Sequence, residues 1–171
     1  MAWQHFRNPT NRIGHDDTIP EPLLVKKVAR TVLREHSFAA VDITLSAERA
    51  LQLRKLILQA QDQAEEIAGS GWFVSDRSGL DPIVYAKVYA SGSGAAEMLE
   101  TASWVRLREK MRNAAVFVCE AGPKWLTDNG VRLMPRDDED WTSLHGIFCK
   151  VLRDSEIEFT IVSKEMTDLS E

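Results

Sequence analysis

The sequence is poor in cysteine and holds no long apolar run, and each absence narrows the class of protein. Its two cysteines, Cys119 and Cys149, lie in apolar segments, where free thiols behave as small hydrophobic side chains. Two isolated cysteines make no zinc motif, and a disulfide would need an oxidising compartment. No segment approaches the roughly 18–20 consecutive apolar residues of a membrane span, and the N-terminus lacks the apolar core of a signal peptide. We therefore expect a cytoplasmic protein with no metal and no membrane partner.

An excess of positive charge is also missing. The chain has 21 basic and 26 acidic residues, with a formal net charge of −5 and a pI of about 5.4. Nonspecific binding to nucleic acid depends mainly on the neutralisation of phosphates by lysine and arginine. The densest basic stretch, residues 106–112, spreads its charges around a predicted helix instead of gathering them on one face. The charge balance argues against a nucleic-acid partner.

The motifs of common enzyme classes are absent from the 171 residues. There is no G-x-S-x-G, no H-E-x-x-H, no paired C-x-x-C, and no Walker-type lysine after a glycine-rich loop. These absences argue against an enzyme without excluding one. We expect no cofactor.

The composition itself, 44% hydrophobic and 27% charged, is typical of a soluble globular domain. Residues 1–21 are polar, contain two prolines and show no apolar period, so they are predicted to form a flexible arm that carries Trp3 and Phe6. Residues 22–171 are predicted to form a single α+β domain. The sequence stops soon after the last predicted strand, which is what a domain truncated at its C-terminus would show.

The apolar periods predict the order of helices and strands. Helices are expected at 22–36, 47–68, 95–113 and 139–153, and strands at 38–46, 71–76, 82–90, 115–121 and 157–164. The helix at 47–68 has the clearest apolar stripe, with Ser46 as its N-cap. The middle of this order is a βαββαβ unit. We therefore predict a ferredoxin-like core with an extra N-terminal helix and a C-terminal αβ extension; the alternative is a three-layer α/β fold with a mixed sheet.

The segment "VYASGSGAAEMLE" reads as a strand, a glycine-serine turn and a helix start. Backbone N–H groups at a helix start can hold an anion, and Ser91, Gly92, Ser93 and Gly94 are the candidate ligand-binding residues. The lysine of a phosphate loop is missing, and Glu97 stands where it can fold back onto the helix start as in a capping box. A plain turn between a strand and a helix is the favoured interpretation.

Two further groups of residues could carry chemistry. His145 and Cys149 lie four residues apart on one predicted helix face, a spacing that suits a metal pair or a thiolate–imidazole pair, although a packed helix edge explains it as well. The acidic run at 137–140 could bind Mg²⁺, but consecutive residues do not share a helix face, and capping by Asp138 explains the run.

Taken together, these features favour a non-catalytic protein-interaction domain, such as a regulatory, adaptor or assembly subunit of a complex. Its partner would be another protein or a second copy of the chain, and the candidate interface residues are Trp3, Phe6, Trp104 and Trp125, because tryptophan is enriched at the centres of interfaces. The alternative is a small-ligand enzyme or sensor that binds an anionic group at the turn from Ser91 to Gly94.

Overall fold

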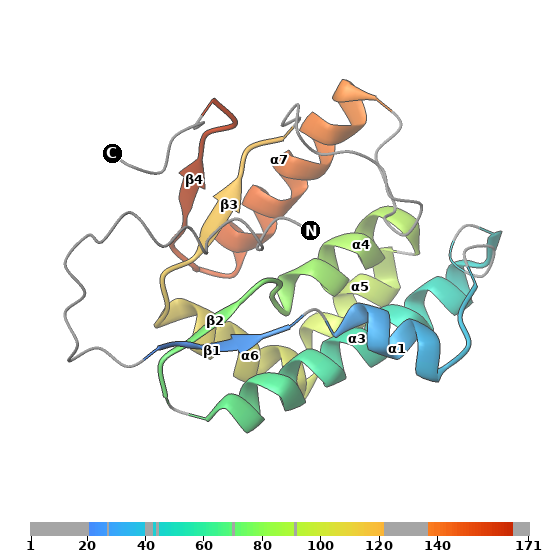
Figure 1. The fold of residues 1–171 in the computed structure, drawn as a ribbon. Helices are drawn as coiled ribbons and strands as arrows, with labels where there is room; N and C mark the ends of the chain where they lie inside the picture. Colours follow the sequence, from blue (N-terminus) through green and yellow to red (C-terminus); the bar gives the residue numbers. More distant parts are fainter. Residues whose placement is uncertain are drawn as a thin grey trace, which may run out of the picture.

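The computed structural model describes residues 21–26, 28–39, 43, 45–69, 71–90, 92–121 and 137–165. Figure 1 shows a mixed α+β fold in which helices predominate, so the predicted α+β class is confirmed at this level. The helices are α1 (Ala29–Glu35), α3 (Ala47–Ala68), α4 (Leu80–Tyr89), α5 (Gly92–Leu99), α6 (Ala102–Arg112) and α7 (Asp138–Asp154). The strands are β1 (Leu23–Val25), β2 (Phe73–Ser75), β3 (Phe117–Cys119) and β4 (Thr160–Val162). No helix in these ranges is long and apolar enough to cross a membrane.

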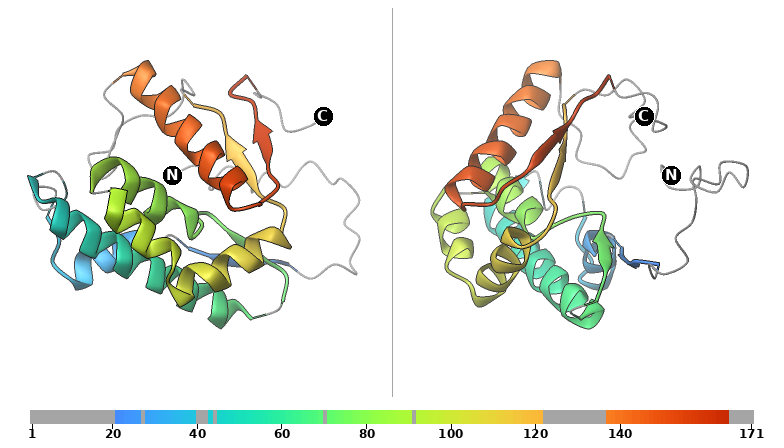
Figure 2. Two further views of the ribbon diagram at one scale, coloured as in Figure 1. Left: turned by 180° about the vertical axis from the view of Figure 1, so that it is seen from behind. Right: turned by 90° about the vertical axis from the view of Figure 1, so that its left-hand side faces the viewer.

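The strands form two separate parallel pairs. Leu23 of β1 lies opposite Phe73 of β2, and Phe117 of β3 lies opposite Thr160 of β4. Parallel neighbours need a crossover connection, and here helices supply it: α1 and α3 between β1 and β2, and α7 between β3 and β4 (Figures 1 and 2). A ferredoxin-like core would need an antiparallel hairpin from 71–76 and 82–90. The described residues contain no such hairpin, so the ferredoxin-like topology is not confirmed.

The predicted strand at 82–90 is wrong, because these residues belong to α4. Asp81 and Pro82 stand in the first turn of this helix, where an acidic side chain is favourable and proline is tolerated. Ile83 and Val84 are both fully buried, so the helix is apolar on more than one side. Short apolar runs of this kind cannot be assigned to strand or helix from their period alone.

Three other boundaries also differ from the prediction. The first predicted helix, 22–36, is strand β1 followed by the shorter α1. In the predicted strand 38–46, Ile43 and Leu45 are helical. The predicted helix 95–113 is divided into α5 and α6 at Thr101, whose hydroxyl accepts a hydrogen bond from the backbone N–H of Trp104 at 3.3 Å and so caps α6.

The clearest sequence patterns are confirmed. Helix α3 spans the predicted residues, and the Ser46 hydroxyl accepts a hydrogen bond from the Arg49 N–H at 3.2 Å. Strands β3 and β4 lie within predicted strands, and α7 begins one residue before its predicted start. The cap of α7 is Asp137 and not the expected Asp138.

The main core gathers around α4, which packs against α3, α5 and α7. Its largest fully buried side chains come from five helices: Leu58, Ile83, Met98, Leu107 and Leu152. A smaller cluster joins α1 to α3 through Val32, Leu53 and Ile57. Helix α3 therefore contributes to both clusters.

Gly79, immediately before α4, is a sensitive point of this core. A Cβ atom placed there would lie 2.6 Å from Leu107 Cδ1 and 3.0 Å from Leu107 Cβ, and the Leu107 side chain is fully buried. We predict that Gly79→Ala lowers the free energy of unfolding by about 1–3 kcal/mol through overpacking, as measured by chemical denaturation. Gly92→Ala is the control, since a Cβ there meets nothing within 4 Å. Equal stability of the two variants would contradict the tight contact.

Candidate anion-binding site

The turn between β2 and α4 connects a strand to a helix. The sequence predicted this layout at a different turn, from Ser91 to Gly94. The turn is closed by Asp81 in the first turn of α4. Its carboxylate accepts hydrogen bonds from the Ser78 N–H at 2.9 Å and from Arg77 Nη1 at 2.8 Å. Because carboxyl ends of parallel strands are the usual place for ligands in α/β folds, this turn is the first place to look for a site.

Gln61 of α3 connects this turn to α3 through hydrogen bonds. Its side chain is only 1% exposed. Its amide nitrogen lies 3.0 Å from Ser75 Oγ at the end of β2, 3.1 Å from the Arg77 carbonyl oxygen and 2.8 Å from Glu65 Oε1. The backbone of the turn is therefore held from α3 as well as from α4.

Arg54, two helical turns before Gln61, is a buried cation that forms no ion pair with the carboxylates of the described residues. The residue is 9% exposed, its Nε is buried without a hydrogen-bond partner, and no ion pair of its guanidinium occurs in the described ranges. Burial lowers the pKa of Arg54, while electrostatic interactions with Tyr85, Tyr89 and Asp81 act in the opposite direction. Asp62, a buried carboxylate further along α3, does have a partner, because it accepts hydrogen bonds from Arg106.

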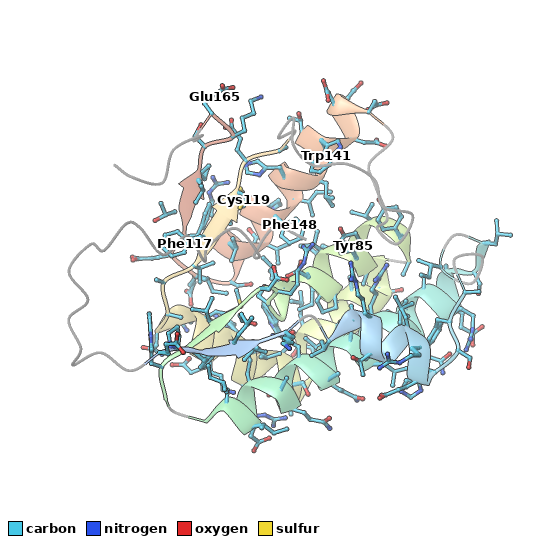
Figure 3. The ribbon with its side chains drawn as sticks, viewed as in Figure 1. Tyr85, Phe117, Cys119, Trp141, Phe148 and Glu165 are labelled. Carbon is cyan, nitrogen blue, oxygen red and sulfur yellow. The ribbon has the colours of Figure 1, made fainter. Side chains whose placement is uncertain are left out.

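Aromatic rings pack beside the Arg54 side chain. The guanidinium carbon lies 4.9 Å from the centroid of the Tyr85 ring. Tyr85 is stacked on Tyr89 at 5.8 Å and meets the edge of Phe148, which reaches it from α7 (Figure 3). Burial raises the pKa of Tyr85, so its hydroxyl stays protonated near neutral pH and can donate a hydrogen bond. The arrangement can therefore present one cation and a phenolic donor to an anion.

The predicted ligand residues lie elsewhere. Gly92, Ser93 and Gly94 form the first turn of α5, and they follow helix α4 where a strand was expected; Ser91 lies outside the described residues. Glu97 forms an ion pair with Lys55 at 2.7 Å. Ser93 is exposed and Gly94 is buried, and the anion site at this turn stays a prediction.

The other candidates are placed as follows. Cys149 is buried, and its Sγ lies 3.6 Å from Nε2 of His145, so the pair predicted to share a helix face does so. No group of three potential metal ligands exists among the described residues. Trp104 is 3% exposed and packs in the core, which leaves it little surface for a partner. Trp3, Phe6 and Trp125 lie outside the described residues.

A family model described as an AAA domain matches residues 17–169. The chain belongs to the AAA domain family. No curated protein and no solved structure matches the chain. The AAA match includes α3, β2 and α4, and with them every residue of the Arg54 site, yet the matched residues contain no Walker-type lysine.

Sequence reasoning missed Arg54, Gln61 and Arg77, although the helix carried a usable signal. Arg54, Leu58, Gln61 and Glu65 are spaced by four, three and four residues and so share one face of α3. Polar residues that continue a buried apolar face at helical spacing indicate either an internal hydrogen-bond network or a ligand site. Nothing in the sequence indicated that Arg77 would lie against this face, because that depends on the position of β2.

Glu65 gives this site a dependence on pH that can be measured. The side chain is 4% exposed, and burial raises its pKa, with the Gln61 hydrogen bond and the Lys110 charge acting against the shift. The folded state therefore binds this proton more tightly than the unfolded state, and stability falls as pH rises through the raised pKa. We predict that Glu65→Gln removes this fall, so that its stability relative to the wild type grows as pH rises from the pKa of an unfolded glutamate, about 4.3, through the raised pKa of Glu65.

The measurement is urea denaturation at several pH values, with the exposed Glu158→Gln as a matched control. The control is expected to follow the wild type throughout. A constant difference between Glu65→Gln and the wild type would show that Glu65 does not titrate in this range.

Proposed function

We propose that the chain is a small-ligand-binding AAA domain that holds an anionic group at the carboxyl end of β2. The observation that carries the proposal is Arg54, a buried guanidinium that forms no ion pair among the described residues; the Asp81 carboxylate acts on it only from beyond ion-pair distance. Arg77, the other cation of the turn, is already engaged by Asp81. Arg54 is therefore the charge that an incoming anion would neutralise.

The magnitudes support a missing anion. Burial of an ion costs several kcal/mol even after relaxation of the protein, and a desolvated cation–π contact returns only about 2 kcal/mol. The contact with the Tyr85 ring thus offsets only part of the free-energy cost of burying Arg54. A guanidinium presents its N–H groups in a planar fork that suits carboxylate and phosphate oxygens, and such charge-assisted hydrogen bonds are about twice as strong as neutral ones.

Membership of the AAA family hints that the anion belongs to a nucleotide. Since the chain has no Walker-type lysine, the proposal rests on Arg54 and not on a phosphate loop. The sequence analysis had the alternative of a ligand sensor that binds an anion at the turn from Ser91 to Gly94. The function proposed here is of the same kind, but its anion would lie beside α3 and α4. No nucleophile or general base is assigned, so the proposal is one of binding.

Replacement of Arg54 by methionine, which keeps the apolar stem and removes the charge, tests the proposal. Without ligand we expect Arg54→Met to be at least as stable as the wild type, because an unpaired buried charge is lost. Phosphate and adenine nucleotides are expected to stabilise the wild type, by about 2.7 kcal/mol at about 100 times Kd, and to leave Arg54→Met unchanged. Thermal unfolding with increasing ligand measures both effects.

Lys87→Gln, an exposed change of the same charge on α4, is the matched control and should keep the full response to ligand. A purely structural Arg54 would give the opposite pattern: a less stable methionine variant and no ligand response in either protein.

A protein-interaction domain is the second candidate, and an apolar surface favours it. Leu23 and Trp72 are 54% and 58% exposed, and they are neighbours, since the Leu23 N–H donates to the Trp72 carbonyl oxygen at 3.0 Å. Ile67, five residues before Trp72, is 85% exposed. Groups of exposed apolar side chains often mark surfaces that bind another protein.

We predict that this surface supports self-association, and that Trp72→Ser weakens it. Light scattering over a range of protein concentrations should show an average mass above that of the monomer for the wild type, and a shift toward the monomer for the variant. Val105→Ser serves as the control, because Val105 is equally exposed, at 57%, but lies on α6. A wild type that stays monomeric throughout would argue against self-association.

A further inference from the structure

A hollow of about 390 Å³ lies beside α1 and is lined by Arg30, Leu33, Arg34 and Phe38; we call it the α1 hollow. Leu33 and Arg34 follow Arg30 by three and four residues, so the three side chains share one face of the helix. No residue of the Arg54 site is among the lining residues. Ligand pockets usually have volumes of roughly 300–1,000 Å³, so this hollow has room for a few side chains of a partner and not for a large ligand.

The turn that ends α1 places Phe38 in this hollow. Ser37 has a left-handed conformation, with a φ of 52°, and the Phe38 N–H donates to the Leu33 carbonyl oxygen at 3.0 Å. In this common C-terminal helix motif, a residue just beyond the helix packs on a residue of its last turns. The guanidinium carbon of Arg49, from α3, lies 4.3 Å from the centroid of the Phe38 ring. Leu33 and Phe38 also pack against the cluster that joins α1 to α3, so they form a fixed apolar floor.

Arg30 and Arg34 give the hollow its charge. Both are exposed, and within the described ranges neither side chain forms an ion pair or a hydrogen bond. The three arginines of α6, by contrast, are all paired with carboxylates. Residues 26–36 carry four basic residues, Lys26, Lys27, Arg30 and Arg34, against the one acidic Glu35, in a chain whose net charge is −5. The surface around α1 is therefore locally basic on an acidic protein.

We infer that the α1 hollow docks an acidic peptide segment of a partner protein. Its carboxylates would pair with Arg30 and Arg34, whose planar N–H groups match carboxylate oxygens, and an apolar side chain would lie on Leu33 and Phe38. An exposed ion pair improves affinity by no more than about fivefold, so a small free anion gains little here, whereas a peptide adds apolar contact to two ion pairs. Nucleic acid fits less well, because the acidic remainder of the chain repels a long polyanion. This docking surface is separate from the proposed ligand site and does not depend on it.

The probe is a short fluorescent peptide in which glutamates flank a leucine–phenylalanine pair, and fluorescence anisotropy measures its dissociation constant. The wild type should bind this peptide, and Arg30→Gln/Arg34→Gln should raise the dissociation constant by about fivefold or more. Lys87→Gln/Lys164→Gln is the matched control, since it removes the same charge from two exposed residues outside the hollow and should keep the wild-type value. No binding to the wild type, or equal affinities of the wild type and the arginine variant, would overturn the inference.

Changes in the peptide test the apolar floor, because replacing Phe38 would also disturb the cluster between α1 and α3. A peptide with serines in place of the leucine and phenylalanine should bind the wild type more weakly, and equal binding would contradict the role of the floor. A single-stranded oligothymidylate of similar length that binds more tightly than the peptide would make this a nucleic-acid surface and overturn the inference. Arg54→Met should bind the peptide as the wild type does, so failure of the proposed ligand site and failure of this docking surface are distinguished. Loss of peptide binding in Arg54→Met would place the peptide at the buried site and not in the α1 hollow.

Discussion

The burial of α4 is the constraint on which the rest of the fold depends. Pro82, Ile83, Val84 and Ala86 are all buried because α4 packs against α3, α5 and α7 at once. A helix buried on several sides must also begin inside the protein, and Gly79 accordingly touches Leu107 of α6. The polar turn between β2 and α4 is half-buried, so part of its backbone needs partners from the protein.

Helix α3 supplies these partners, and this explains its mixed face. Leu53 and Leu58 fill the two apolar clusters, while Gln61 reaches the turn and Asp62 pairs with Arg106. The hydrogen bonds of the polar side chains Gln61 and Asp62 offset the cost of burying them. Arg54 departs from this rule, because a ring and not a carboxylate faces it. Among the described residues, Arg54 Nε is the buried side-chain nitrogen that lacks a hydrogen-bond partner. Such a group has more meaning than an unpaired group on a loosely packed surface, where water would take the place of the partner.

The parts of the fold that local chemistry decides could be predicted from the sequence. Ser46 and a regular apolar stripe defined α3, and the apolar run around Val118 defined β3. The residues of α4 could not be assigned correctly, because a helix that is buried on several sides loses the polar face that distinguishes it from a strand. The Arg54 site was beyond reach for a different reason. It depends on contacts of Arg77 and Tyr85 with α3, and the long-range packing of the chain determines these contacts.

The same reasoning applies to two glycine-serine turns that could hold an anion. Ser93, at the start of α5, is exposed, whereas the turn at Arg77 is hydrogen-bonded to Gln61 of α3, the helix that carries the buried Arg54. Two unit charges 4 Å apart attract by about 1 kcal/mol in water and by about 4 kcal/mol at an effective dielectric constant of about 20. An exposed helix start bears only about half a unit charge, and salt screens it further. An anion is therefore attracted more strongly to the buried Arg54 than to the start of α5, although the glycine-serine motif at Ser93 resembles a phosphate-binding turn more closely.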